Sequence, residues 1–120
     1  MTTDETGRIG EEAAAAYLRR EGFELCARNW RTGHYELDIV ARKWDVLHVV
    51  EVKTRRTGSL TPPEAAATQA KFKALRRAAA AYLAHEEWQG DVQFDLAAVV
   101  VGADGAAEVR LIENAMEYHW

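Results

Sequence analysis

The stretch "ELDIVARKWDVLHVVEVK", residues 36–53, decides the fold and also carries charges that a buried sheet would tolerate poorly. Two apolar runs flank Trp44-Asp45, and both are rich in the residues that strands favour. We therefore predict strands at residues 36–42 and 46–54, joined by a tight connection. The charged residues within them are Glu36, Asp38, Glu51 and Lys53.

Strand geometry brings two of these charges together. Side chains alternate between faces, so Glu36, Asp38 and Val40 share one side of the first strand, and Glu51 and Lys53 share one side of the second. A two-residue hairpin loop places Asp38 directly opposite Glu51. Opposed carboxylates destabilise a sheet unless a cation compensates, and Mg²⁺ binds carboxylate oxygens and leaves positions open for phosphate. The alternative is a solvated hairpin face on which these are ordinary surface charges.

The remaining chain predicts an α/β fold. A helix is expected at 4–21, where good helix formers end at Gly22, and a second at 64–87, where Phe72, Leu75, Ala79, Tyr82 and Leu83 share one face. Further strands are expected at 23–30, 92–101 and 107–112. The predicted order is αβββαββ, with helices flanking a central mixed sheet.

Composition limits the class of protein. With 120 residues, 48% hydrophobic and 28% charged, residues 1–120 are expected to form one globular domain. A net charge of −4 argues against a generic polycation that coats nucleic acid. There is no apolar run of ~20 residues and no signal-peptide layout, so we expect a cytoplasmic protein without membrane contact.

Other chemistries find little support. The chain contains no H-E-x-x-H zinc motif, no G-x-x-x-x-G-K-[ST] phosphate loop and no G-x-S-x-G elbow. Cys26 lies in an apolar segment and is expected to be a small buried side chain. His48 is expected to be a packed structural residue. Asp95 interrupts an apolar strand, so we expect a hydrogen-bonded structural carboxylate or a partner for a helix.

Several motifs together support a resemblance to known proteins. "ELDIV" followed by "EVK" resembles the signature of the PD-(D/E)xK nuclease superfamily, whose restriction-endonuclease-like core has the order αβββαβ. With "GRIGEEAAAAYLRREGF", "RNWR", "VVEVKTR", "PPEAAATQAKFKALRRAAAAYL" and "FDLAAV", the chain resembles, nearly end to end, the YraN family of small bacterial proteins. That family is similar to the archaeal Holliday junction resolvases.

This resemblance implies a catalytic role for particular residues. It assigns Asp38 and Glu51 as ligands of Mg²⁺ or Mn²⁺, together with the backbone carbonyl near Val52, and Lys53 as the catalytic lysine. It also nominates Glu11 as a helix-borne acid near the metal. Helical periodicity permits that role, although Glu12 could serve equally and an exposed glutamate in the first turns is the ordinary alternative.

The implied function is a Mg²⁺-dependent endonuclease that hydrolyses phosphodiester bonds in duplex or branched DNA. Phosphate contacts are expected from Arg28, Arg31, Arg55 and Arg56, and Lys71 is expected to point toward the active edge of the sheet. Solvated faces are the default interpretation of these basic clusters. The chain departs from the family in having Tyr35, after His34, where a glycine usually precedes the E-x-D tripeptide.

Two questions stay open at this point. Glu36 can act as a supporting acid or as the counterion of a basic side chain. A non-hydrolytic DNA-binding or scaffold protein that keeps the nuclease fold is the alternative function. A homodimer would help either role, because two copies would combine their basic surfaces.

Overall fold

A computed structural model describes residues 1–115 and confirms the predicted α/β class. In chain order the elements are α1 (Thr3–Arg20), β1 (Glu24–Thr32), β2 (Tyr35–Lys43), β3 (Val46–Arg56), the 3₁₀ helix η1 (Pro63–Ala66), α2 (Gln69–Glu86), β4 (Asp91–Val101) and β5 (Ala107–Ile112). The strands form one sheet in the order β1-β2-β3-β4-β5. Only β3 and β4 are parallel, because α2 carries the chain back across the sheet between them.

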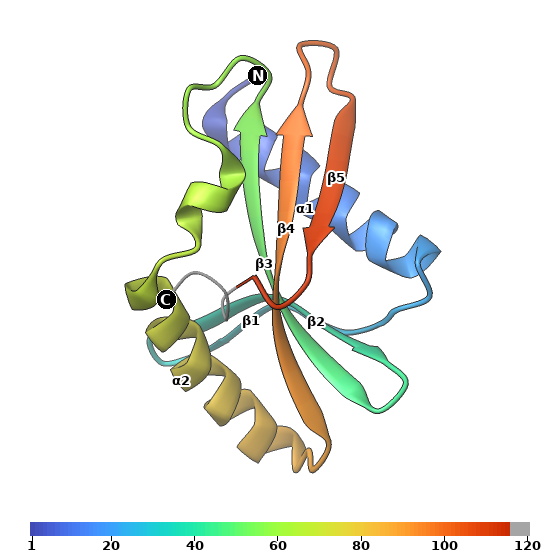
Figure 1. Cartoon of the computed structure of the whole chain (residues 1–120), viewed down its shortest axis with the longest axis vertical. Helices are drawn as coiled ribbons and strands as arrows, with labels where there is room; N and C mark the ends of the chain where they lie inside the picture. Colours follow the sequence, from blue (N-terminus) through green and yellow to red (C-terminus); the bar gives the residue numbers. More distant parts are fainter. Residues whose placement is uncertain (116–120) are drawn as a thin grey trace.

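The two helices cover opposite faces of a strongly twisted sheet. Figure 1 shows that the β1–β2 hairpin runs at a steep angle to β3, β4 and β5. Helix α1 lies behind the sheet and α2 in front of it. Ala14, Ala15 and Leu18 of α1 pack against strand residues such as Val50 and Val99. On the other face, α2 packs against a second set of strand residues through Leu75, Ala78, Ala79 and Tyr82. The predicted apolar face of the second helix is therefore confirmed.

A glycine sets the distance between α1 and the sheet. A Cβ added at Gly10 would lie 1.8 Å from Thr54 Oγ1, so no larger residue fits without movement. The helix begins two turns earlier, where Thr2 accepts a hydrogen bond from the Glu5 amide and Glu5 bonds back to Thr2. This close approach brings Glu11, the next residue, to the side of β3.

The central hairpin has the predicted two-residue loop. Lys43 pairs with Val46 across Trp44 and Asp45, and the same register continues to Ile39 opposite Val50. Trp44 has a positive φ of 55° and is 83% exposed at the tip. Beyond the last of these pairs, the twist separates β2 from β3 and opens the sheet toward the charged residues.

Two sequence predictions are wrong in detail. The helix expected at 64–87 is divided, because Ala67 leaves helical geometry and the Thr68 hydroxyl caps a new helix by accepting from the Lys71 amide. Cys26 is exposed rather than buried. The β1–β2 register shifts between Leu25 and Ala27, and this bulge turns Cys26 away from the core. Within residues 1–115, no helix is both long and apolar enough to cross a membrane.

Candidate active site

Asp38 and Glu51 meet where β2 diverges from β3. Glu51 is only 8% exposed, and Asp38 is partly buried beside it. The Val52 backbone N–H donates to Asp38 Oδ2 at 2.9 Å, which replaces the next ladder bond of the hairpin. Asp38 and Glu51, which were expected to oppose each other, are thus brought together. The Asp38 carboxylate is hydrogen-bonded to the backbone of β3 instead of lying free in solvent.

Burial makes both carboxyl groups harder to ionise. Burial, followed by the charge of Asp38, raises the pKa of Glu51 from 4.5 to about 7, although Lys71 acts in the opposite direction. Burial also raises the pKa of Asp38, against the opposing effect of the Val52 N–H. A pair of buried carboxylates with raised pKa values attracts a proton or a metal cation.

Two lysines border this pair from different elements. Lys71, in the first turn of α2, places Nζ 3.1 Å from Glu51 Oε1. Burial lowers the pKa of Lys71. The carboxylates of Glu51, Asp38 and Glu36 outweigh this effect, so the pKa of Lys71 is raised overall. Lys53 lies on β3, two residues beyond Glu51, and is half-buried. Among residues 1–115, no ion pair within 4 Å engages Lys53.

Glu11 approaches the pair from α1. Burial and the charge of Asp38 raise the pKa of Glu11, while Arg28 and a hydrogen bond from Asn29 lower it. Asn29 has a positive φ of 50° in the middle of β1, a backbone geometry that asparagine tolerates better than most residues. Asn29 was not predicted to be a site residue. The "RNWR" motif was the only quoted motif that contained it.

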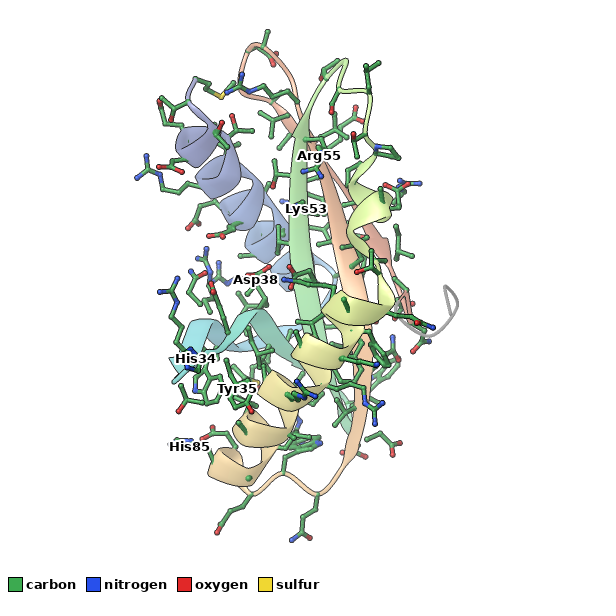
Figure 2. All side chains as sticks on the ribbon, turned by 90° about the vertical axis from the view of Figure 1, so that its left-hand side faces the viewer. His34, Tyr35, Asp38, Lys53, Arg55 and His85 are labelled. Atoms are coloured by element: carbon green, nitrogen blue, oxygen red, sulfur yellow. The ribbon has the colours of Figure 1, made fainter. Side chains whose placement is uncertain are left out.

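Two clefts are lined by neighbours of the carboxylate pair, although neither lining includes Asp38 or Glu51. One of about 590 Å³ lies between α1 and β3 and includes Glu11, Lys53 and Arg55 in its lining. Another of about 280 Å³ lies between the β1–β2 turn and α2, and its lining includes Tyr35 and Lys71. Figure 2 shows Arg55, Lys53, Asp38, His34 and Tyr35 succeeding one another down this side of the molecule.

The arginines predicted to bind phosphate have protein partners. Arg28 pairs with Glu12 at 2.9 Å, and Arg31 pairs with Glu36 at 3.3 Å, so Glu36 is the counterion of a basic side chain. Arg55 donates to the Thr54 carbonyl. Arg56 donates to Thr6 Oγ1 and to the Met1 carbonyl, near the start of α1. Of these four, Arg55 and Arg56 line the larger cleft beside Lys53.

A second cluster of titratable side chains lies on the α1 face of the sheet. His48 and Asp95 are buried and hydrogen-bonded to each other, as their structural interpretation predicted. Glu113 completes the cluster, and the three residues offer ligand atoms that lie within 4.8 Å of one another, an arrangement that could hold a metal ion. Sequence reasoning missed the cluster, because its members come together only through the parallel register of β3 and β4 and the return of β5.

The fold and these sites define a class: an α/β protein with a five-stranded mixed sheet and a buried carboxylate pair bordered by lysines. Comparison with known proteins then identifies the family. Residues 10–99 match the model described as "Uncharacterised protein family UPF0102", and the chain belongs to that family.

Relatives from distant bacteria match over most of this chain. A UPF0102 protein of Bacteroides thetaiotaomicron is 43% identical over 112 residues, covering 93% of this chain and 92% of the relative. One from Syntrophomonas wolfei is 40% identical over 112 residues, covering 92% and 96%. One from Oleidesulfovibrio alaskensis is 46% identical over 98 residues, covering 81% of this chain and 48% of that longer relative.

Proposed function

We propose that this protein is a Mg²⁺-dependent endonuclease of the PD-(D/E)xK type that hydrolyses phosphodiester bonds in duplex or branched DNA. The observation that carries the proposal is the buried pair of Asp38 and Glu51, in which burial raises the pKa of both carboxyl groups and the charge of Asp38 raises that of Glu51 further. Lys53 follows Glu51 by two residues and lines the larger cleft. The lysine of the E-x-K motif therefore borders a space in which a substrate could lie.

The carboxylate pair suits a hard divalent cation. Asp38, Glu51 and the backbone carbonyl near Val52 would hold it, since Mg²⁺ and Mn²⁺ prefer oxygen ligands. When bound, the ion would act as a Lewis acid on a phosphate oxygen and acidify a water molecule. Its charge would also offset the repulsion that now keeps a proton on Glu51 near neutral pH.

The side chains around the pair have separate roles in this proposal. Lys53 orients the attacking water and stabilises negative charge that develops on the phosphoryl oxygens. Glu11, whose pKa is raised by burial and by the charge of Asp38, lines the larger cleft and would exchange a proton with water there. Arg55 and Lys71 contact phosphates on either side of the scissile bond, which fixes orientation without reading sequence.

A DNA partner must overcome the acidic character of the chain. Arg28 and Arg31 become available for phosphates when Glu12 and Glu36 release them, and both ion pairs are exposed enough for that exchange. A homodimer would present two copies of the cleft to a duplex or junction.

One observation favours a second candidate function. The Lys71 ammonium contacts Glu51, so a protein cation already neutralises part of the carboxylate pair. A DNA-binding or scaffold protein that keeps the nuclease fold without hydrolysis would retain such an internal ion pair. The two functions differ in whether a metal replaces Lys71 at Glu51.

A cleavage assay separates them. Purified protein is incubated with labelled duplex, single-stranded and four-way-junction DNA, in Mg²⁺, in Mn²⁺ and with a chelator. The endonuclease cleaves at least one substrate only with metal, and Lys53→Ala lowers the rate by about 10² or more while DNA affinity persists, because Lys53 acts mainly on the transition state. Lys73→Ala, an exposed lysine on the same helix as Lys71, is the matched control for loss of positive charge.

The scaffold gives a different result in the same assay. It binds DNA without cutting it, Lys53→Ala leaves binding unchanged, and Arg55→Ala and added salt weaken it, since phosphate contacts release counterions. Cleavage that continues in the chelator or in identically prepared Lys53→Ala protein identifies a contaminating nuclease.

A further inference from the structure

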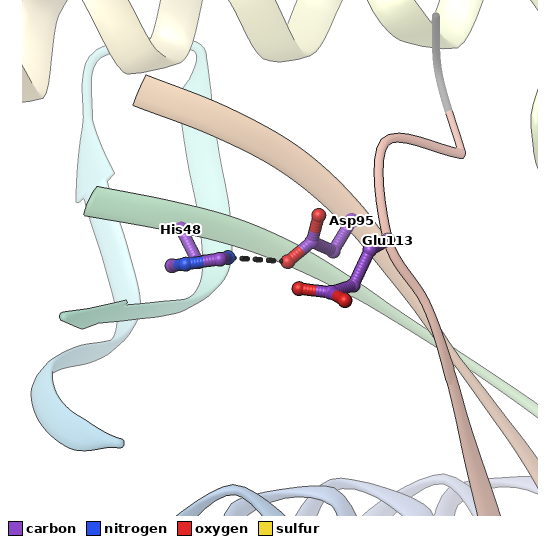
Figure 3. A group of neighbouring side chains, drawn as sticks. All are labelled: His48, Asp95 and Glu113. Carbon is purple, nitrogen blue, oxygen red and sulfur yellow. Dashed lines mark hydrogen bonds and ion pairs between the residues drawn. The ribbon is translucent and has the colours of Figure 1, made fainter. Parts of the chain in front are cut away.

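Three strands bring His48, Asp95 and Glu113 together away from the proposed active site. His48 lies on β3, Asp95 on β4, and Glu113 directly after β5 (Figure 3). Their ligand atoms lie within 4.8 Å of one another. The His48 ring meets Phe23 edge to face on the α1 side of the sheet, whereas Glu51 faces α2. The cluster and the Asp38–Glu51 pair are therefore on opposite faces.

The inner part of this cluster is almost closed to solvent. His48 is 5% exposed and Asp95 is completely buried, whereas Glu113 is exposed. His48 Nδ1 lies 2.6 Å from Asp95 Oδ2. In the tautomer that carries its hydrogen on Nδ1, the imidazole donates this bond to the carboxylate. Glu113 is therefore the solvent-facing member of the cluster.

Apart from His48, which pairs with Asp95, no basic side chain of residues 1–115 balances the negative charge of the cluster. Within residues 1–115, no lysine or arginine forms an ion pair with Asp95 or Glu113. Neutral groups bridge the carboxylates instead: Gln93 Nε2 donates to Asp95 Oδ1 at 2.9 Å and lies 3.3 Å from Glu113 Oε1. A buried carboxylate beside a second one is costly without a cation.

We propose that His48, Asp95 and Glu113 form a structural site for a divalent transition-metal ion of the Zn²⁺ class. One imidazole nitrogen with two carboxylates favours Zn²⁺ over Mg²⁺, which prefers oxygen ligands and retains its waters. Binding replaces the hydrogen on His48 Nδ1, so one proton leaves when the ion enters. Water would occupy the fourth coordination position of the ion, on the side of Glu113.

The surrounding hydrogen bonds hold the ligands in place. Asp95 Oδ1 accepts from Gln93 and, at 3.0 Å, from the backbone N–H of Asn114, which follows Glu113. Such bonds orient a carboxylate so that its other oxygen can face the metal. An ion bound here would connect the end of β5 to the centre of the sheet, and the site would stabilise the fold without taking part in hydrolysis.

Titration of the full chain with Zn²⁺ tests this proposal. After chelator dialysis, we expect one Zn²⁺ per chain by calorimetry and mass spectrometry, with a higher melting temperature in Zn²⁺. Glu113→Gln should weaken binding about tenfold or more and abolish the thermal shift, since it removes an exposed ligand without disturbing the buried pair. Glu108→Gln, an exposed change on β5, is the control and should bind as the wild type does.

The variants also distinguish this site from the proposed active site. Zn²⁺ binding that survives in Asp38→Asn and is lost in Glu113→Gln supports the proposal, whatever the outcome of the cleavage assay. Absence of saturable binding, equal affinity in Glu113→Gln and wild type, or loss only in Asp38→Asn would overturn it.

Discussion

Lys71 Nζ lies 3.1 Å from Glu51 Oε1, so a lysine of α2 neutralises a buried carboxylate of β3. The contact depends on the break between η1 and α2, because the Thr68 cap places Lys71 in the first turn of the new helix. Lys71 remains 44% exposed as a side chain, whereas Glu51 is nearly buried. The lysine can therefore leave the carboxylate more easily than the carboxylate can reach solvent.

Lys71→Met should strengthen Mg²⁺ binding at about pH 8, by roughly threefold to tenfold, because a metal no longer competes with the ammonium for Glu51. Calorimetric titration of both proteins measures the change. Lys73→Met removes an exposed lysine outside this contact and should leave the affinity unchanged. Weaker Mg²⁺ binding in Lys71→Met would show that the lysine supports the metal site instead of competing for it.

Stability of the metal-free protein should fall as pH rises from about 4.5 to about 7. In this window folded Glu51, with its pKa raised to about 7, keeps a proton that the unfolded chain has lost, so ionisation favours unfolding. The corresponding loss in the free energy of unfolding is up to about 3 kcal/mol. Urea denaturation across the window measures it.

Glu51→Gln isolates this effect from other titrating groups. Glutamine cannot ionise, so the variant should show a flatter pH dependence and greater stability than wild type at about pH 8. Parallel pH profiles for the two proteins would mean that Glu51 ionises normally in the folded state.

The central hairpin shows how far sequence alone leads. Loop length predicted the register that runs from Lys43–Val46 to Ile39–Val50, and Asp38 and Glu51 meet just beyond its last pair instead of within the ladder. The Lys71 contact depends on where α2 begins. The sequence there is a continuous alanine-rich helical pattern, in which a capping hydroxyl does not stand out. Glu113 joined Asp95 and His48 only through the sheet order, which local patterns leave undetermined. Lys71 was expected to point toward the sheet and does so, but its partner Glu51 and the cluster around Glu113 depend on contacts between distant elements that the sequence does not specify.

Gly10→Ala should destabilise the protein by about 1–3 kcal/mol, because the new Cβ would lie 1.8 Å from Thr54 Oγ1 and force α1 away from β3. Gly7→Ala is the matched control in the same helix. A Cβ at Gly7 has no atom within 4 Å, so this change should stabilise the helix by up to about 1 kcal/mol. Thermal denaturation of both variants tests the sign, and equal effects would contradict the close packing at Gly10.

Mg²⁺ affinity should rise with pH and level off above about 7. Below that pH the ion must displace a proton from Glu51, whose pKa is about 7, so affinity should change about tenfold per pH unit. Asp38→Asn removes both a ligand and the charge that raises the pKa of Glu51, and should abolish measurable binding. Glu108→Gln is the control, since Glu108 is an exposed residue of β5 outside this site. Calorimetry between about pH 6 and pH 8 measures these affinities. If Asp38→Asn kept the wild-type affinity, the metal would have to bind elsewhere, and the endonuclease proposal would lose the observation on which it depends.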